Sequence, residues 1–482
     1  MPIYDRDQRK QLDALVEDFS QNKLGRRQFM QRALAAGLSV SAATSLLVAC
    51  GGAAATQTAN PFGKINHFII LYQENWSFDS LFPSFPGADG ISNASPTSLQ
   101  QVDKNGIPYA SLPQPLDNGK PDRRFPANLP VKPFEAGLYV SVDQKTGDLV
   151  GRFYQEQLQI DGGKMDKFIP YSNAGGLVMS YYDSTNLPAG KLAQQYTMAD
   201  HFFHAAFGGS MLNHFWLISA STPTFPNAPA SIVAQLDATG NLVKDGAVTP
   251  DGYLVNTAFT VNTPHPASAK PETLVPLQTM PNIGDRLTAK NLSWAWYSGG
   301  WNDALAGHPD PLFQFNHQPF AYFATTADGT QAKAQHLKDE QDFLAALKNG
   351  TLPAVSFVKP LGVNNEHPCY ATELAGQLHV ADLVKAVQNS SNWKDTAIII
   401  TYDENGGRWD HVSPPTGDRW GPGTRVPAII VSPFAKKGAV DHTVYDTTSI
   451  LRTIEVRWNL LPLGIRDAKV NDLRNALPLA VG

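Results

Sequence analysis

Apolar residues gather in five runs of strand length, at residues 65–72, 292–297, 354–358, 396–402 and 426–431. Charged residues hardly interrupt these runs, which is typical of parallel strands that are covered on both faces. Two stretches between the runs have apolar residues at helical spacing. The first consists of Leu337, Leu344 and Leu347 before Gly350, and the second of Val380, Leu383, Val384 and Val387. The alternation of strands and helices predicts an α/β fold with a mostly parallel sheet.

Residues 84–150 and 221–290 lack this periodicity and are rich in Pro, Asn, Gly and Thr. Long segments without regular elements inside a compact domain are usually functional loops. We therefore expect loop-rich insertions that shape a substrate cleft.

Two of the strand runs are followed by a pair of residues with side-chain oxygens, and each pair includes at least one carboxylate. Glu74 and Asn75 come after the first run, and Asp403 and Glu404 come directly after the run at 396–402. Ligands of open parallel sheets bind beyond the carboxyl ends of the strands. Four oxygen donors there predict a site for one hard divalent cation, with Mg, Ca and Mn favoured. Taken singly, each pair is more typical of a helix cap or a solvated loop, and only their shared position favours metal ligation.

Ser210 follows two glycines and precedes an apolar helical stretch at residues 215–220. Such a turn exposes the serine at a helix N-terminus, where free N–H groups favour an anion. Ser210 is thus a candidate nucleophile, although on position alone a helix cap is the more ordinary role. The turn lacks the G-x-S-x-G elbow of α/β-hydrolases, and no Pro or Arg stands where a sulfatase signature needs them.

Three histidines have the context of catalytic groups. His317 lies in an Asn-His-Gln-Pro segment, His367 follows the run at 354–358, and His411 follows Asp410 near the second acidic pair. Hydrolysis of an ester requires a proton for the leaving oxygen, which histidine can supply. The alternative for any isolated histidine is a core or surface position. For His411, the sequence leaves open whether it contacts substrate or braces its loop.

The N-terminus has the features of an export signal. Arg26 and Arg27 precede an Ala-rich apolar run at residues 33–49, which is short and contains Gly, Ser and Thr, so it is a poor membrane span. Residues 47–51 are similar to a lipobox, which predicts lipidation of Cys50. We expect a twin-arginine signal at 1–49, a tether at 50–63 and one domain at 64–482. The alternative is a weak membrane anchor.

The expected partners are therefore the twin-arginine export machinery and, through the lipid on Cys50, a membrane, with the protein in the periplasm or at the cell surface. Cys50 and Cys369 are the two cysteines of the chain, so lipidation leaves no pair for an internal disulfide. A formal net charge of −5 argues against a nucleic-acid partner, because phosphate neutralisation needs a basic surface. With 482 residues and 42% hydrophobic content, the chain can bury a large core.

Several motifs resemble the bacterial phosphoesterase family of phospholipases C and acid phosphatases. They are Glu74-Asn75-Trp76-Ser77-Phe78-Asp79, Gly162-Gly163-Lys164-Met165-Asp166, residues 209–214, Glu366-His367-Pro368, residues 402–415 and Gly421-Pro422-Gly423-Thr424-Arg425-Val426-Pro427. Together they span about residues 64–465. The resemblance implies a three-layer α/β/α fold like that of alkaline phosphatase.

The resemblance also implies the roles of the site residues. Ser210 would be the nucleophile, metal ligands would be Glu74, Asn75, Asp403 and Glu404, and His317 and His367 would contact phosphate or transfer protons. Asn75, Asn213 and His411 are the candidate substrate-binding residues. One departure concerns Gly151, which stands where the family pattern has an active-site histidine.

We expect a metal-assisted hydrolase of phosphoric esters. An acid-phosphatase-like phosphomonoesterase with a phosphoserine intermediate is favoured, because Ser210 followed by Asn213-His214 is more similar to the acid-phosphatase branch. The alternative is a phospholipase C that cleaves phosphodiester head groups. A second alternative is a surface-anchored binding lipoprotein without catalysis, for which Gly151 is the supporting feature.

Overall fold

The computed structural model describes residues 15, 18, 24, 26–35 and 60–478. Helix α2 (Arg26–Ala35) contains the paired arginines, whereas Cys50 and most of the apolar run lie outside the described residues. Among the residues that are described, no helix is both long and apolar enough to cross a membrane. Residues 60–63, assigned to the tether by sequence, form a turn in which Phe62 is buried.

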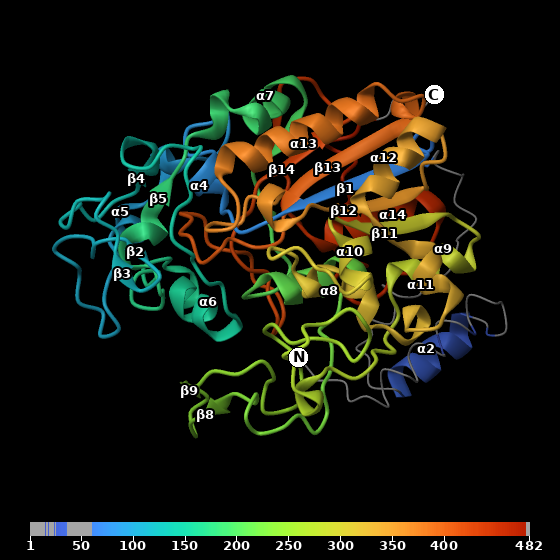
Figure 1. Cartoon of the computed structure of the whole chain (residues 1–482), viewed down its shortest axis with the longest axis horizontal. Helices are drawn as coiled ribbons and strands as arrows, with labels where there is room; N and C mark the ends of the chain where they lie inside the picture. Colours follow the sequence, from blue (N-terminus) through green and yellow to red (C-terminus); the bar gives the residue numbers. More distant parts are fainter. Residues whose placement is uncertain (1–14, 16–17, 19–23, 25, 36–59, 479–482) are drawn as a thin grey trace.

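The core of the molecule is one eight-stranded sheet (Figure 1). Its strands lie in the order β11 (Leu337–Asp339), β10 (Trp294–Ser298), β12 (Val355–Lys359), β1 (His67–Gln73), β13 (Thr396–Tyr402), β14 (Ala428–Val431), β6 (Thr197–Ala199) and β15 (Ala439–Asp441). Neighbouring strands are parallel except at β14, which is antiparallel to both neighbours. Strands β6 and β15 therefore run in the same direction as β1 and β13.

Helices cover both faces of the sheet. Alternate residues of a strand point to opposite faces, and Tyr72 of β1 contacts α8 (Ser210–Ser219), whereas Gln73 contacts Glu366, which abuts α13 (Glu373–Gln388). Phe68, on the same face as Tyr72, packs on Trp458 of α14 (Thr448–Trp458). On the other face, α7 (Pro188–Gln195) is hydrogen-bonded to α13 (Figure 1). The three-layer α/β/α architecture is thus confirmed.

The remaining elements are short. The helices are α4 (Phe78–Leu81), α5 (Pro96–Leu99), α6 (Phe153–Ile160), α9 (Ile283–Ala289), α10 (Trp301–Leu305), α11 (Gln331–His336) and α12 (Glu340–Asn349). Four small sheets pair β2 (Leu116–Asp117) with β3 (Lys120–Pro121), β4 (Phe134–Glu135) with β5 (Ser180–Tyr181), β7 (Phe202–Phe203) with β16 (Tyr445–Asp446), and β8 (Gln235–Leu236) with β9 (Leu242–Lys244). The two expected loop-rich segments contain only such short elements.

Two details of the sequence prediction were wrong. The run at 426–431 forms β14, which is antiparallel rather than parallel. Leu337 lies in β11 and not on a helix with Leu347, because Asp339 caps the helix that starts at the next residue. Leu344 is 42% exposed, and Phe343 takes the buried position instead. The second predicted helical face, from Val380 to Val387, is buried in α13 as expected.

Candidate active site

Two parallel strands bring the acidic pairs together. In the pairing of β1 with β13, Gln73 lies opposite Tyr402, so the next residues, Glu74 and Asp403, leave the sheet side by side. The Asp403 amide donates a hydrogen bond to the Gln73 carbonyl at 3.0 Å, which extends this register beyond the strand. Both carboxylates are fully buried. A pair of like charges in a low-dielectric setting needs compensation from its surroundings.

Asn75 and Asp403 are fixed by backbone contacts. The amides of Asn75 and Glu404 donate to Asp403 Oδ1 at 3.1 and 2.8 Å. Asn75 adopts a left-handed conformation with φ of 66°, and a Cβ at Gly406 would stand only 2.4 Å from its carbonyl oxygen. A glycine is therefore required at position 406 for the two strand ends to approach this closely.

Lys359 and His317 contact Glu74 from two neighbouring elements. Lys359, the last residue of β12, is fully buried with Nζ 2.5 Å from Glu74 Oε1, and His317 Nε2 lies 2.8 Å from the same oxygen. Burial acts to raise the pKa of Glu74, but His317 and Lys359 lower it well below its usual range. Asp403 is less well compensated, and burial together with Glu74 raises its pKa to about 7.

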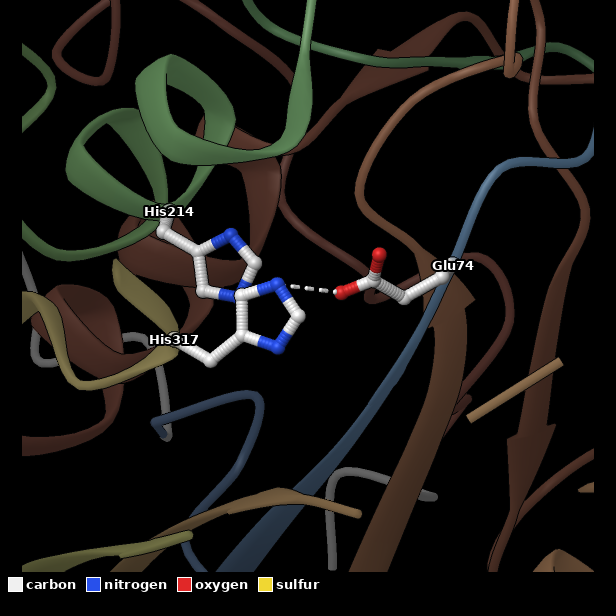
Figure 2. Close-up of side chains that lie close together, drawn as sticks. All are labelled: Glu74, His214 and His317. Atoms are coloured by element: carbon white, nitrogen blue, oxygen red, sulfur yellow. Dashed lines mark ion pairs between the residues drawn. The ribbon is translucent and has the colours of Figure 1, made fainter. Parts of the chain in front are cut away.

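Figure 2 shows the imidazoles of His214 and His317 side by side, both on the same side of Glu74. The rings of His214 and His317 are stacked, with centroids 4.9 Å apart, and His317 points its Nε2 at the carboxylate. Burial and nearby Lys359 lower the pKa of His317 to about 4, although Glu74 acts in the opposite direction. His317 is thus a neutral ring at neutral pH, which assigns its proton to Nε2 for a hydrogen bond to Glu74. His214 is held by a 2.6 Å contact between its Nδ1 and the Ser210 carbonyl.

Ser210 is the first residue of α8, as the sequence predicts. Its hydroxyl oxygen lies 3.4 Å from both Glu74 Oε2 and Asn75 Oδ1. The first amides of a helix have no partner within the helix, so they are available to an anion at this position. The hydroxyl is thus next to the proposed metal ligands and at an anion-binding helix end.

The loop before Ser210 is anchored by contacts with two buried side chains, Glu156 and His204. Glu156 accepts from the Gly208 amide at 2.5 Å and from the backbone and hydroxyl of Thr424. His204 Nε2 lies 2.9 Å from Glu156, and its Nδ1 lies 2.8 Å from the carbonyl of Ala206, which can only accept. Burial lowers the pKa of His204, but Glu156 raises it above its usual value, so the pair is an ion pair that fixes the loop before Ser210.

Asn213 was expected to bind substrate, but its side chain is used within the same loop. Its amide nitrogen donates to the carbonyl of Ala206 at 2.9 Å, and its oxygen accepts from the Ala206 amide at 2.9 Å. The side chain is fully buried. Asn213 therefore positions the turn that presents Ser210.

His367 approaches the cluster from the β12–α13 connection. Its Nε2 lies 4.0 Å from Glu74 Oε2, and its Nδ1 lies 2.6 Å from the Pro368 carbonyl, which assigns the proton to Nδ1 and leaves Nε2 facing the site. The preceding Glu366 is anchored by Gln73 at 2.8 Å and the Tyr402 hydroxyl at 2.7 Å, at the ends of β1 and β13. The strand ends therefore also hold the histidine loop.

Glu404 lies at the edge of the cluster. Its Oε2 accepts from the Gly406 amide at 2.6 Å, and burial together with Asp403 raises its pKa well above the usual value. A Cβ at Gly151 would stand 2.5 Å from Glu404 Oε2. The Glu404 carboxylate thus fills the space that a side chain at position 151 would enter.

His411 lies in a different cluster. Its Nδ1 is 2.6 Å from Asp79 Oδ2, and its Nε2 is 3.2 Å from Asp89, so it braces the 402–415 loop against α4. Asp410, its neighbour, is paired with the buried Arg425 at 2.9 Å. The structure therefore groups Glu74, Asn75, Ser210, His317, His367, Asp403 and Glu404 at one place, whereas Asn213 lies behind Ser210 and His411 lies apart.

Sequence reasoning missed Lys359, His214 and the pair Glu156–His204. Lys359 directly follows the apolar run at 354–358, which is the signal that identified the acidic pairs, but a lone lysine after a strand is usually solvated. Its proximity to Glu74 depends on β12 lying beside β1, and the pattern of apolar residues does not predict this strand order.

The ligand set fits a hard divalent cation. Glu74, Asn75 and Asp403 offer oxygen donors around Ser210, and Asp403 Oδ2 is buried without a hydrogen-bond partner among the described residues. A buried, unpartnered carboxylate oxygen is costly. A cation bound to this oxygen would remove the cost, and oxygen-rich sites suit Mg, Ca or Mn.

Comparison with known proteins gives relatives along the whole domain. The non-hemolytic phospholipase C of Burkholderia pseudomallei is 29% identical over 483 residues, covering 90% of this chain and 61% of that protein. Phospholipase C B of Mycobacterium tuberculosis is 25% identical over 516 residues, covering 94% of this chain and 86% of that protein. The chain thus spans less than two thirds of the Burkholderia enzyme.

Among solved structures, a protein of the alkaline phosphatase superfamily from Vibrio parahaemolyticus is similar over 66% of this chain and 70% of its own, with 9% identity and a TM-score of 0.31. The family model described as "Phosphoesterase family" matches residues 65–461. Because this match includes every strand end that forms the site, the chain belongs to the Phosphoesterase family, which groups it with hydrolases of phosphoric ester bonds.

Proposed function

We propose that the protein is a phosphomonoesterase that uses Ser210 as its nucleophile and forms a phosphoserine intermediate. The observation that supports this most directly is the position of the Ser210 hydroxyl, 3.4 Å from Glu74 and Asn75 at the first residue of α8. A hydroxyl at a helix N-terminus is suited to attack a bound phosphate group, because the helix amides favour the negative charge of its oxygens.

In the proposed reaction, the Ser210 hydroxyl, 3.4 Å from Glu74 Oε2 and Asn75 Oδ1, releases its proton to water as Oγ attacks phosphorus. His367, as an imidazolium with protons on both ring nitrogens, protonates the leaving oxygen through Nε2, because its Nδ1–H stays bonded to the Pro368 carbonyl. His317 is less suited to this step, since its neutral ring donates to Glu74. Water then hydrolyses the phosphoserine and restores the free hydroxyl.

The proposed cofactor is one divalent cation held by Glu74, Asn75 and Asp403, with Glu404 at the edge of the site. When bound, such a cation would screen the phosphoryl charge and stabilise charge that develops during transfer. Lys359 contributes a second positive charge beside Glu74.

The choice of a monoester over a diester rests on charge. A phosphomonoester carries up to two negative charges and a phosphodiester one, and the site combines a buried lysine with a cation site and a helix N-terminus. The second candidate is a phospholipase C, favoured by the names of the two curated relatives above. A non-catalytic binding lipoprotein is disfavoured, since both acidic pairs, Ser210 and the two histidines are present together.

For location, we propose export by the twin-arginine route with a lipid on Cys50. The support is the sequence alone: the paired Arg26 and Arg27, the apolar run at 33–49 and the lipobox-like residues 47–51.

Replacement of the nucleophile gives the first prediction. Ser210→Ala should lower kcat by about 10³-fold or more, while inorganic phosphate still binds, because the metal ligands and helix amides are unchanged. Steady-state kinetics and phosphate titration measure the two effects. Ser391→Ala, in an exposed turn, is the matched control and should keep wild-type kcat. A Ser210→Ala enzyme with most of its activity would disprove the nucleophile assignment.

Metal binding should depend on pH through Asp403. Its pKa of about 7 means that the carboxyl holds a proton below pH 7 and is ionised above it. Metal ions bind the ionised form, so the affinity of the chelator-treated protein for Mn²⁺ should fall by about tenfold per pH unit below 7. Isothermal titration between pH 5.5 and 8 measures this.

The control for the metal experiment is Asp403→Asn, which removes the titrating ligand. This variant should bind Mn²⁺ more weakly and lose most of the pH dependence. An affinity that is independent of pH in the wild-type protein would contradict the assigned ligand.

Substrate preference separates the two candidate activities. We expect kcat/KM for p-nitrophenyl phosphate to exceed that for p-nitrophenyl phosphorylcholine by at least about tenfold, because the positive site favours the dianion. Chelator should abolish both reactions. The opposite preference would establish the phospholipase C alternative while leaving the Ser210 mechanism intact.

A further inference from the structure

A second cluster of histidines and carboxylates lies at the same edge of the sheet as the active site. Strands β6 and β15 run in the same direction as β1 and β13, so their carboxyl ends also reach this edge. Asp200 and His201 directly follow β6, and His442 directly follows β15. The hydrogen bond from the Asp200 amide to the Asp441 carbonyl, at 3.2 Å, holds these two strand ends together.

Asp200 lies between the two imidazoles. His201 Nδ1 is 2.9 Å from Asp200 Oδ1, and His442 Nδ1 is 2.8 Å from Asp200 Oδ2. The three ligand atoms lie within 4.8 Å of one another. In a tetrahedral zinc site with bonds of about 2.0–2.1 Å, ligand atoms are roughly 3.3 Å apart, so a small outward shift of the imidazoles would create that spacing.

Asp89 gives the cluster an outer support. His201 Nε2 lies 3.3 Å from Asp89 Oδ2, and the Asp89 amide donates to Asp200 Oδ2 at 2.8 Å. Metal-binding histidines usually donate their second ring N–H to a carboxylate, which fixes the ring orientation. With Nδ1 toward Asp200 and Nε2 toward Asp89, His201 already has this arrangement. His411 in turn holds Asp89 at 3.2 Å.

Burial and charge agree with a cation site. The Asp200 side chain is fully buried, His201 is 21% exposed and His442 is 61% exposed, so the cluster is rigid at its base and open to water at His442. Burial acts to raise the pKa of Asp200, but the hydrogen bond with His201 lowers it below the usual value.

We propose that Asp200, His201 and His442 form a binding site for Zn²⁺ that is separate from the active site, with water completing the coordination. Two imidazoles and a carboxylate suit a borderline ion such as Zn²⁺ better than Mg²⁺ or Ca²⁺. A bound ion would link the end of β6 to the end of β15. Because Asp89 contacts both Asp200 and His201, the ion would also stabilise the loop after α4. The residues of this site make none of the active-site contacts described above.

The test is to count zinc ions on the full chain. Protein is stripped with chelator, equilibrated with Zn²⁺ alone, and analysed for bound zinc per chain and by isothermal titration. The wild-type protein should bind one equivalent more than His442→Gln, which retains a hydrogen-bond donor to Asp200 but replaces the imidazole. We expect at least about a 100-fold loss of affinity at this site, while hydrolysis is unchanged.

Two controls make the result specific. His308→Gln replaces another exposed histidine and should keep the wild-type zinc content. Asp403→Asn affects the active site and should retain the equivalent that depends on His442, so a failure of the proposed active-site metal is distinguishable from a failure of this one. Equal zinc content and affinity in wild type, His442→Gln and His308→Gln would overturn the proposal and leave the cluster as a hydrogen-bond network.

Discussion

The site depends on the parallel pairing of β1 with β13, which places Glu74 and Asp403 side by side in the protein interior. Two buried carboxylates repel each other, so the surrounding structure must supply positive charge. Lys359 Nζ and the His317 imidazole lie 2.5 and 2.8 Å from one oxygen of Glu74, whereas Lys359 Nζ lies 3.7 Å from Asp403 Oδ2. Asp403 is thus the less well compensated carboxylate, which supports the proposal that this pair of strand ends binds a cation.

Ser210, the proposed nucleophile, is positioned by a second buried pair. Glu156 and His204 lie under the glycine turn, and Asn213 closes the turn from within α8. Gly208 has a φ of 90°, and a Cβ at this residue would stand 2.4 Å from the backbone of Phe153. The turn can therefore be tight only because Gly208 has no side chain. It is held in place because the buried Glu156 carboxylate accepts a hydrogen bond from the Gly208 amide.

Much of this arrangement could be predicted from sequence. The central strands are continuous apolar runs, so their ends, and the acidic residues after them, were visible as a pattern. Lys359 was missed because its burial depends on strand order, and β6 and β15, with three residues each, are too short to produce a pattern. The positions of Asn213 and His411 followed from hydrogen bonds to Ala206 and Asp79, which no local spacing reveals.

The central claim is covalent catalysis by Ser210. Its most direct measurement is to quench the reaction with acid during turnover of a phosphate ester and to map phosphorylated peptides by mass spectrometry. The account predicts phosphate on the peptide that contains Ser210, and no phosphate on that peptide in Ser210→Ala. Turnover with phosphate on a different residue, or with no phosphorylated peptide under conditions that trap the intermediate, would contradict it.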